Sequence, residues 1–518
     1  MLDATPLLRV YAGWRSRQLD REDAVNAQKR ELLKLVTKAR DTRFGRDHGF
    51  DTITDVETFQ ERVPLRRFED FWEDYWSSAF PVLTDCTWPG TVPFFAETSG
   101  TTTGKTKYIP CTHEMNRSNT FAGADILVHH LRNTPGSTLL AGLNFVLGGS
   151  TGLRELAPGV RTGDLSGIAA SVMPSWVRWR YFPPRELETI ADWEERLDAL
   201  AGAAIGQDIR SISGTPSWLL VFLDRLRALQ PDNEARLTSF FPNLEMIVHG
   251  AVHFAPYRAS FGEWLTGSRC KTREVYAASE GFIAIADRAD GEGMRLIADG
   301  GLFYEFVPAD ELGTANPTRH WLADVETGVD YAIVVTSCAG AWSYVLGDTV
   351  AFVDRAPPRL LVTGRTSFML SAFGEHLIAS EIDDVVTDSA SAIGRRIVEF
   401  AVGPIYPTAS EPKGGHVYIV EFDGPVPDPD TCGRFMRLID EGLSQCNDDY
   451  GAHRIGMLAP QLHAATPGAF YDWMKKRGQL GGQHKVPRII NDMDLLDDLL
   501  DFVAKRKPPE PEGPGGSL

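Results

Sequence analysis

The stretch "TSGTTTGKTKYIP", residues 98–110, carries a Gly-Lys-Thr triplet behind a run of small polar residues. It is not a P-loop, because only three residues separate Gly100 from Gly104, and Ser99 stands where that motif requires its first glycine. A turn rich in serine, threonine and glycine still offers backbone N–H groups and hydroxyls to phosphate oxygens, and its lysines add positive charge. Taken alone, the same composition also fits an ordinary surface linker.

Length and composition predict a large globular enzyme of two or more domains, since the chain has 518 residues, of which 43% are hydrophobic. The formal net charge of -18 argues against general nucleic-acid binding. The six cysteines are scattered and form no C-x-x-C pair. They are typical of reduced intracellular thiols rather than of a disulfide framework or a zinc site.

Charged residues interrupt every apolar run within the first 23 residues, so we expect no signal peptide there. No window of the chain approaches 18 uncharged apolar residues, which predicts no membrane span. These features together predict a cytoplasmic protein without a membrane partner.

Hydrophobic periodicity predicts helices over 22–40, around 66–77 and over 113–133. Apolar runs and helix-like stretches then alternate as far as residue 279, an order that is typical of an α/β domain. The stretches concerned are 138–149, 218–229, 244–250 and 273–279.

From 302 to 363 the pattern becomes rich in strands, and a smaller segment with its own helices and strands, such as 416–422, follows. We therefore place a domain boundary near 364–372, with a large domain over 1–363 and a small one over 364–506. The Pro/Gly-rich end, 507–518, is expected to be disordered.

Four further motifs accompany the Thr/Gly loop in a fixed order: a Tyr-x-x-Ser-Glu group, a Gly-Asp pair, a Gly-Arg segment and a late lysine. They lie in "VYAASEGFIA" (275–284), "SYVLGDTVAF" (343–352), "GRTSFMLSAFGEHLIASEID" (364–383) and "GGQHKVPR" (481–488). This is the linear order of adenylate-forming enzymes, and the 364–383 stretch resembles the hinge pattern of that superfamily.

Within that superfamily, the chain resembles the Gretchen Hagen auxin-responsive family, the acyl-acid amido synthetases, and looks like a bacterial-type member. The plant members join amino acids to hormone carboxylates such as jasmonate or auxin. One departure is Ser343-Tyr344, where many members read Arg-Tyr before the Gly-Asp motif. The resemblance covers nearly the whole chain and is carried by "TRFGRDHGF" (42–50), "VPLRRFEDF" (63–71), "TSGTTTGKTKYIP", "SGTPSWLL" (213–220), "YAASEG", "GLFYEFVP" (301–308), "LGDTVAF" and "QHKVPR".

The resemblance implies an α/β fold in which a large N-terminal adenylate-forming domain, with a β-rich part, precedes a smaller, mobile C-terminal α+β domain. It implies an ATP- and Mg²⁺-dependent ligase that adenylates a small carboxylic acid and transfers the acyl group to an amine, with an amino acid expected. Transfer to a thiol, of coenzyme A or a carrier protein, stays open as the alternative. A non-catalytic adenylate-binding module is disfavoured because charged residues occupy the motif positions that call for them. We expect a monomer or a weak dimer.

The same resemblance implies roles for individual residues. Glu280 would hold Mg²⁺, Asp348 would accept from the ribose hydroxyls, and Lys485 would reach the α-phosphate or the carboxylate. Gly250 and Ala251 would give adenine a flat backbone surface. The other ATP- or AMP-binding positions implied are Ser99, Gly100, Thr101, Thr102, Lys107, Tyr276, Ala278, Ser279 and Arg365.

Each role has a plainer alternative. Glu280 fits a surface carboxylate at the end of a strand, Asp348 a turn residue, and Lys485 one surface lysine among many. For the acyl substrate, Arg117 would pair with the carboxylate or simply face solvent, and Trp218 would line the pocket or belong to the core.

Two further features are weighed from the residues themselves. His249 and His253 have the spacing of a zinc helix, but Gly250 lies between them and the expected glutamate is missing, so we expect no zinc. Phe368 occupies the expected pivot position of the hinge, although its bulk also suits a packed, rigid site.

Overall fold

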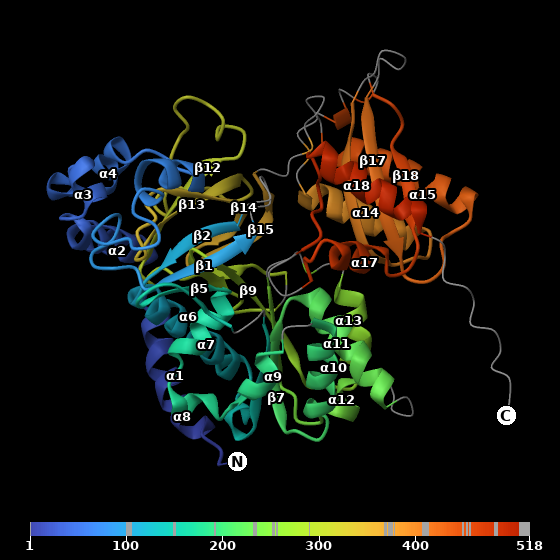
Figure 1. Cartoon of the computed structure of the whole chain (residues 1–518), viewed down its shortest axis with the longest axis horizontal. Coiled ribbons are helices and arrows are strands. Elements are labelled where there is room, and N and C mark those ends of the chain that lie inside the picture. The colour runs from blue at the N-terminus through green and yellow to red at the C-terminus, as the bar shows by residue number, and fades with distance from the viewer. Residues whose placement is uncertain are drawn as a thin grey trace. The chain divides into compact units, whose positions relative to one another are not determined.

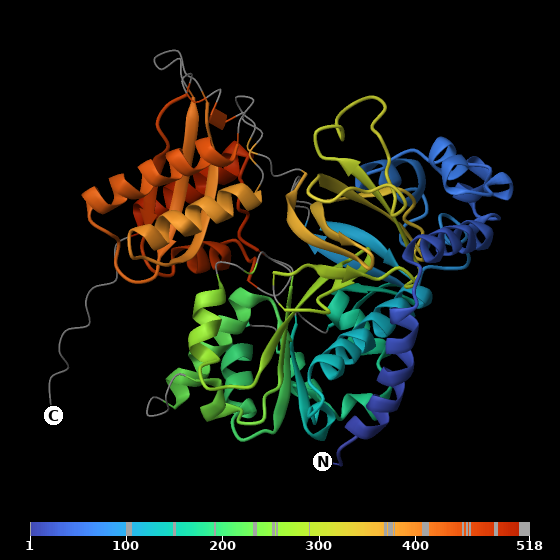
Figure 2. The same cartoon turned by 180° about the vertical axis from the view of Figure 1, so that it is seen from behind.

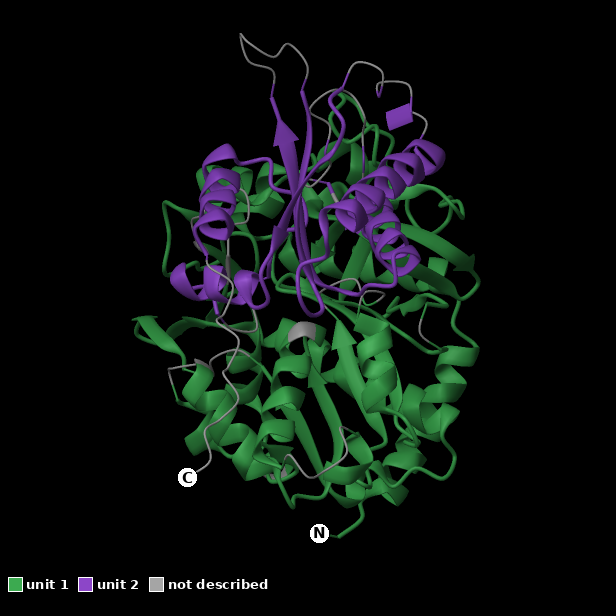
Figure 3. Cartoon of the chain, turned by 90° about the vertical axis from the view of Figure 1, so that its right-hand side faces the viewer, with its two compact units in different colours: residues 1–363, 481–483 green, residues 364–480, 484–518 purple. Residues whose placement is uncertain are grey.

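The chain forms two compact units in the computed structural model, the first ending at Thr363 and the second beginning at Gly364 (Figure 3). The structure gives only the backbone at 98–99, 106, 176, 193, 217 and 365. It describes residues 2–506 except for 100–105, 149–151, 191–192, 231–235, 251–253, 255–256, 290, 367–369, 371–376, 378, 407–413, 448–449, 452–453, 455–456 and 481–484.

An eleven-stranded sheet forms the centre of the first unit and has a parallel and an antiparallel part. The parallel part runs in the order β9, β8, β7, β3, β6, with bounds Lys271–Ala278, Met246–Gly250, Ile209–Gly214, Leu143–Leu147 and Tyr181–Phe182. The other strands are β12 (Leu302–Pro308), β13 (Asp330–Ser337), β14 (Tyr344–Arg355), β15 (Pro358–Arg365), β11 (Met294–Leu296) and β10 (Gly281–Ile285).

Helical connections build the parallel part, because parallel neighbours cannot be joined by a tight turn. Helices α10, α11, α12 and α13 lie on one side of β7, and α6 and α7 lie on the other (Figures 1 and 2). The bounds are α10 Trp193–Ala204, α11 Pro216–Leu229, α12 Leu237–Phe240, α13 Arg258–Trp264, α6 His113–Asn133 and α7 Leu165–Val172.

The α/β prediction is confirmed, and so are its longer elements. The predicted helix over 22–40 is α2 (Ala24–Ala39), where the Asp23 carboxylate accepts from the Asn26 N–H and caps the first turn. The helix over 113–133 is α6, capped by Thr112. The region around 66–77 divides into α5 (Phe68–Phe71) and a π-helical turn, η2 (Trp72–Trp76).

A four-stranded sheet carries the stretch with which the sequence analysis began. Strands β1 (Phe94–Ser99) and β2 (Thr106–Cys111) form an antiparallel hairpin in which Ser99 pairs with Thr106. Residues 100–105 therefore connect the two strands and are themselves outside the described residues. Strands β5 (Val160–Gly163) and β4 (Arg154–Ala157) complete this sheet.

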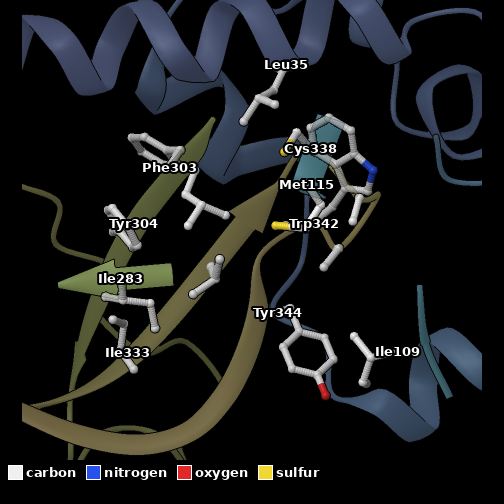
Figure 4. Close-up of a cluster of buried hydrophobic side chains, with 14 of the residues drawn as sticks. Leu35, Ile109, Met115, Ile283, Phe303, Tyr304, Ile333, Cys338, Trp342 and Tyr344 are labelled. Carbon is white, nitrogen blue, oxygen red and sulfur yellow. The ribbon is translucent and has the colours of Figure 1, made fainter. Parts of the chain in front are cut away.

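The core of the first unit closes around the antiparallel strands. Figure 4 shows side chains of β12, β13 and β14 meeting those of α2, α6 and β2, among them Phe303, Ile333 and Tyr344. Trp342 is fully buried there, and its indole N–H donates to the Thr87 carbonyl at 2.8 Å. The N-terminal end of β14 is thus held by close packing on several sides.

Among the described residues of the second unit, a three-stranded sheet is covered by the helices α14, α15, α17 and α18. The strands β16 (Ile397–Ile405), β17 (Gly415–Phe422) and β18 (Gln461–Ala465) alternate their side chains between two cores. One core lies against α14 (Ala379–Ala392) and α15 (Pro429–Cys446). The other lies against α17 (Ala469–Lys476) and α18 (Met493–Lys505). The predicted tail over 507–518 lies outside the described residues.

The N-terminal helix α1 and several short helices complete the described elements. Within the described part of the chain, no helix has the length and apolar character needed to cross a membrane. The remaining bounds are α1 Thr5–Asp20, α3 Arg43–Asp47, η1 Phe50–Thr52, α4 Val56–Arg62, η3 Leu139–Ala141, α8 Ser175–Arg178 and α9 Arg185–Glu188.

Candidate active site

The predicted nucleotide residues of the first unit gather where neighbouring strands of the large sheet end. Gly250 is the last residue of β8 and pairs with Val275 of the adjacent, parallel β9. A Cβ atom at Gly250 would lie 2.2 Å from the Val275 carbonyl oxygen, so no residue with a side chain fits this backbone. Three residues beyond Val275, β9 ends at the predicted Ala278, and the predicted Ser279 begins the turn that follows.

A hydrogen bond joins two of the predicted residues across the sheet. The Tyr276 hydroxyl on β9 donates to Oδ2 of Asp348 on β14 at 2.7 Å. Both residues are 7% exposed. A buried carboxylate needs such donors, because its desolvation is otherwise costly. The sequence predicted both residues, but not that they touch.

An irregularity in β14 accompanies the placement of Asp348. Val345 pairs with Val334 and Thr349 with Ala332, so a single residue of β13 lies opposite the three residues between them on β14. Gly347, within that segment, has φ +92°, which a residue with a side chain rarely adopts. Such bulges re-aim side chains. Here the bulge carries the carboxylate that Tyr276 contacts.

Glu280 lies in the two-residue turn between β9 and β10, and its side chain is half-buried. The next residue, Gly281, has φ +151°, and a Cβ atom there would lie 2.8 Å from Cδ1 of Leu302. The turn is therefore packed against β12. Among the described residues, no group of three or more His, Cys, Asp or Glu side chains could hold a metal. The magnesium role of Glu280 stays a prediction.

Lys107 on β2 forms an ion pair with Glu69, with 2.8 Å between Nζ and Oε1. Its ammonium also lies 5.1 Å from the centre of the Phe68 ring. Burial pushes the pKa of Glu69 upward, but the hydrogen bond and charge of Lys107, together with a backbone hydrogen bond and the charge of Arg67, lower that pKa below its usual value. A phosphate contact by Lys107 would compete with this pair.

The two residues predicted for the acyl substrate lie in different surroundings. Arg117 on α6 has a side chain that is 79% exposed, with Nη2 3.9 Å from Glu114, so it faces solvent in this structure. Trp218 on α11 is 8% exposed and belongs to the buried residues of the first unit. Neither arrangement identifies an acyl pocket, and both roles stay predictions.

Lys485 belongs to the second unit, where it is exposed. Arg365 is the last residue of β15, and its side chain is outside what the structure describes. The predictions for Gly100, Thr101, Thr102, Ala251 and Phe368 also fall outside the described residues, as does the side chain of Ser99.

His249, weighed above as a metal ligand, is 1% exposed and stacks on Phe254 with 3.7 Å between ring centres. The ring is therefore part of the packing beneath the end of β8. His253 lies outside the described residues.

A buried polar cluster next to β14 was not predicted. It consists of Glu305 on β12, Arg319 in the β12–β13 connection and Ser343 at the start of β14. No motif pointed to Arg319, which stands in a polar connection. Only Ser343 was noted, as a departure from the pattern of the resembled family.

Comparison with solved structures places this fold in a known class. The acyl acid amido synthetase AtGH3.15, solved in complex with 2,4-DB, superposes with a TM-score of 0.79 at 17% identity, covering 95% of this chain and 96% of that one. A 2-hydroxyisobutyryl-CoA ligase superposes with a TM-score of 0.60 at 15% identity, covering 92% and 91%. The two-unit fold is thus one that amido synthetases and acyl-CoA ligases share.

Sequence comparison narrows the class to a family. Residues 16–152 match the GH3 family N-terminal domain, 295–365 the GH3 family central domain and 380–494 the GH3 family C-terminal domain, together more than half of the chain. The chain belongs to the GH3 family. The indole-3-acetic acid-amido synthetase GH3.8 of Oryza sativa subsp. indica is 28% identical over 310 residues, which are 54% of this chain and 49% of that protein. The chain spans about half the length of the first curated relatives it matches.

Proposed function

We propose that the protein is an ATP-dependent ligase that joins a carboxylic acid to an amine through an acyl adenylate. The observation that carries this proposal is the Tyr276–Asp348 hydrogen bond, which brings two separate motifs of the adenylate-forming pattern to one place on the sheet. Family membership and the shared fold support it. The acceptor we propose is an amino acid, as the names of the amido synthetase relatives suggest.

The chemistry divides into two half-reactions. A carboxylate oxygen of the acid attacks the α-phosphorus of ATP, a new P–O bond forms, and the bond to pyrophosphate breaks with its electron pair on the leaving group. The amine nitrogen then attacks the acyl carbon, AMP leaves, and the nitrogen loses a proton. Both steps need the reactants held in position and the charge on the phosphates neutralised.

The first unit supplies the groups that hold the nucleotide in this proposal. Asp348, oriented by the Tyr276 hydroxyl, would accept hydrogen bonds from the ribose hydroxyls. Gly250, where a side chain cannot fit, would leave the strand end open to the adenine ring. Glu280 would hold Mg²⁺, a hard ion that prefers carboxylate oxygen and neutralises charge on the departing pyrophosphate.

The second unit would supply Lys485 as the cation for adenylation. Adenylation needs a positive charge at the α-phosphate, whereas amide formation needs that space for the incoming amine. A small domain that moves between the half-reactions would meet both needs, with the hinge near 364–372. The large domain, 1–363, would bind ATP and the acid.

The experiment that tests this function is pyrophosphate release with pooled carboxylic acids, followed by pooled amines. We expect acid-dependent release of pyrophosphate with AMP as the second product, and an amide when an amine is added. Stoichiometric ADP and inorganic phosphate would overturn the proposal, because they place the attack on the γ-phosphate instead.

A thiol acceptor is the second candidate, and the fold shared with the 2-hydroxyisobutyryl-CoA ligase favours it. The two candidates differ only in the second half-reaction. An amine panel and a thiol panel, run with the same acid, separate them by whether an amide or a thioester accumulates.

A further inference from the structure

Ser343, the residue just before β14, holds an unusual backbone conformation. Its φ is +43°, and it is fully buried. The left-handed region is unfavourable for a residue with a side chain, so the surroundings must impose it. The strain lies five positions before Asp348, immediately ahead of the strand that carries it.

Three elements hold Ser343 in place through hydrogen bonds. Its N–H donates to Oγ1 of Thr336 on β13 at 2.9 Å, and its carbonyl accepts from the Arg66 N–H at 3.0 Å. Its hydroxyl donates to Oε2 of Glu305 on β12 at 2.8 Å. Every polar group of the residue is therefore engaged, which accounts for a conformation that serine alone would avoid.

Arg319 holds this arrangement together from the β12–β13 connection. Its Nε donates to Oε1 of Glu305 at 2.9 Å, and its Nη2 donates to the Ser343 hydroxyl oxygen at 2.8 Å. Its Nη1 donates to the carbonyls of Gln60 and Val63, both at 2.7 Å. The Glu305 side chain is 1% exposed, so this carboxylate needs a cation beside it. Arg319 supplies that cation and ties two strands to the end of α4.

The cluster acts on the part of β14 that carries Asp348. On one side of the bulge, Ser343 fixes the start of the strand, and the Val345 N–H donates to the Arg66 carbonyl at 2.8 Å. On the other side, Thr349 resumes pairing with Ala332. A bulge pinned at both ends presents its side chain in one direction, and that direction is toward Tyr276.

We propose that Arg319 is a positioning residue for nucleotide binding, which with Glu305 and Ser343 sets the place of Asp348. This inference rests on the proposed function. Wild-type protein that binds no ATP would refute that function, whereas unchanged binding in the variants below would refute only the inference.

The first test compares two charge-conserving variants by calorimetric titration of the full chain with ATP. Arg319→Lys keeps the charge but cannot make the forked contact, and we expect the Kd for ATP to rise about tenfold, the scale of one hydrogen bond to a charged group. Arg15→Lys is the matched control, because Arg15 is also buried, with 2% of its side chain exposed against 12% for Arg319, and is forked onto Asp125 and Asp299, away from β14. It should lose thermal stability with an unchanged Kd. Equal changes in the two variants, or an unchanged Kd in Arg319→Lys, would overturn the proposal.

The second test removes the buried charge pair. Arg319→Ser should weaken ATP binding further, because it leaves the Glu305 carboxylate without its cation and removes the contact to Ser343. The double variant Arg319→Ser with Glu305→Gln should regain folding stability, since no buried charge is left uncompensated, but should keep the weakened Kd. Should Arg319→Ser fail to fold, the double variant still reports the Kd, and a wild-type Kd there would refute the proposal.

Discussion

Replacing Tyr276 by phenylalanine isolates the contact on which the proposed nucleotide site is built. The change removes the hydroxyl that donates to Asp348 at 2.7 Å and leaves the ring in its buried position. A hydrogen bond to a charged group contributes about 1.5–3 kcal/mol, and loss of this one leaves a buried carboxylate less satisfied. That energy corresponds to roughly 10- to 150-fold in an equilibrium constant.

The loss should divide between stability and binding. Part of it lowers the free energy of unfolding, measured by urea denaturation. The rest should appear as a weaker Kd for ATP, because a contact that orients Asp348 toward the proposed ribose position is lost. We expect the Kd to rise about tenfold, the lower end of that range, in calorimetric titration.

Tyr331→Phe is the matched control. Tyr331 is as deeply buried, on the neighbouring β13, and its hydroxyl accepts from the Glu326 N–H at 3.1 Å. That variant should lose stability and keep the Kd for ATP. The reasoning fails if Tyr276→Phe binds ATP like the wild type, or if both variants weaken binding equally.

Three further predictions concern other positions. Glu280→Gln should fold normally and lose about 10²–10³ in acid-dependent pyrophosphate exchange, because one positioned contact to the phosphates is gone; near wild-type exchange at saturating Mg²⁺ would return Glu280 to a surface role. Lys485→Ala should slow acyl-adenylate formation strongly in single-turnover experiments, while a supplied acyl adenylate still reacts with amine near the wild-type rate; equal losses in both half-reactions would argue against a lysine that moves away. Gly250→Ala should lower the free energy of unfolding, measured by urea denaturation, by about 1–3 kcal/mol, because its Cβ meets the Val275 carbonyl oxygen. The control Gly262→Ala in α13 meets no atom within 4 Å and should not lower it. Equal free energies of unfolding in the two variants would show that β8 and β9 separate more easily than their register implies.

The sequence predicted those parts of the fold that depend on short-range patterns. Helix α6 has the predicted bounds because Thr112 caps its start. Strand β13 consists mainly of apolar residues, and all but its first residue are buried. The hairpin partner β2 was missed. Its polar residues, such as Lys107, resemble the loop before them, and only pairing with β1 makes them a strand.

The candidate site shows the same limit. Motifs identified Tyr276 and Asp348 separately, but their hydrogen bond spans 72 positions and depends on a bulge that no local pattern reveals. Arg319 was missed for a related reason, since its contacts with Glu305 and Ser343 exist only after three segments have packed together. The pairing of Lys107 with Glu69 likewise changes what that lysine is available to do.

The sheet of the second unit, buried on both faces by its own helices, has a consequence for how the chain can vary. Its two cores draw on residues of that unit, so a large-to-small change such as Phe435→Ala or Trp473→Ala is felt inside it. The first unit closes its main core separately, around Trp342 and Phe303. A packing change in one unit can therefore be compensated by substitutions within the same unit, without a change in the other. Recombination between relatives at the 363/364 junction would exchange whole cores rather than halves of one.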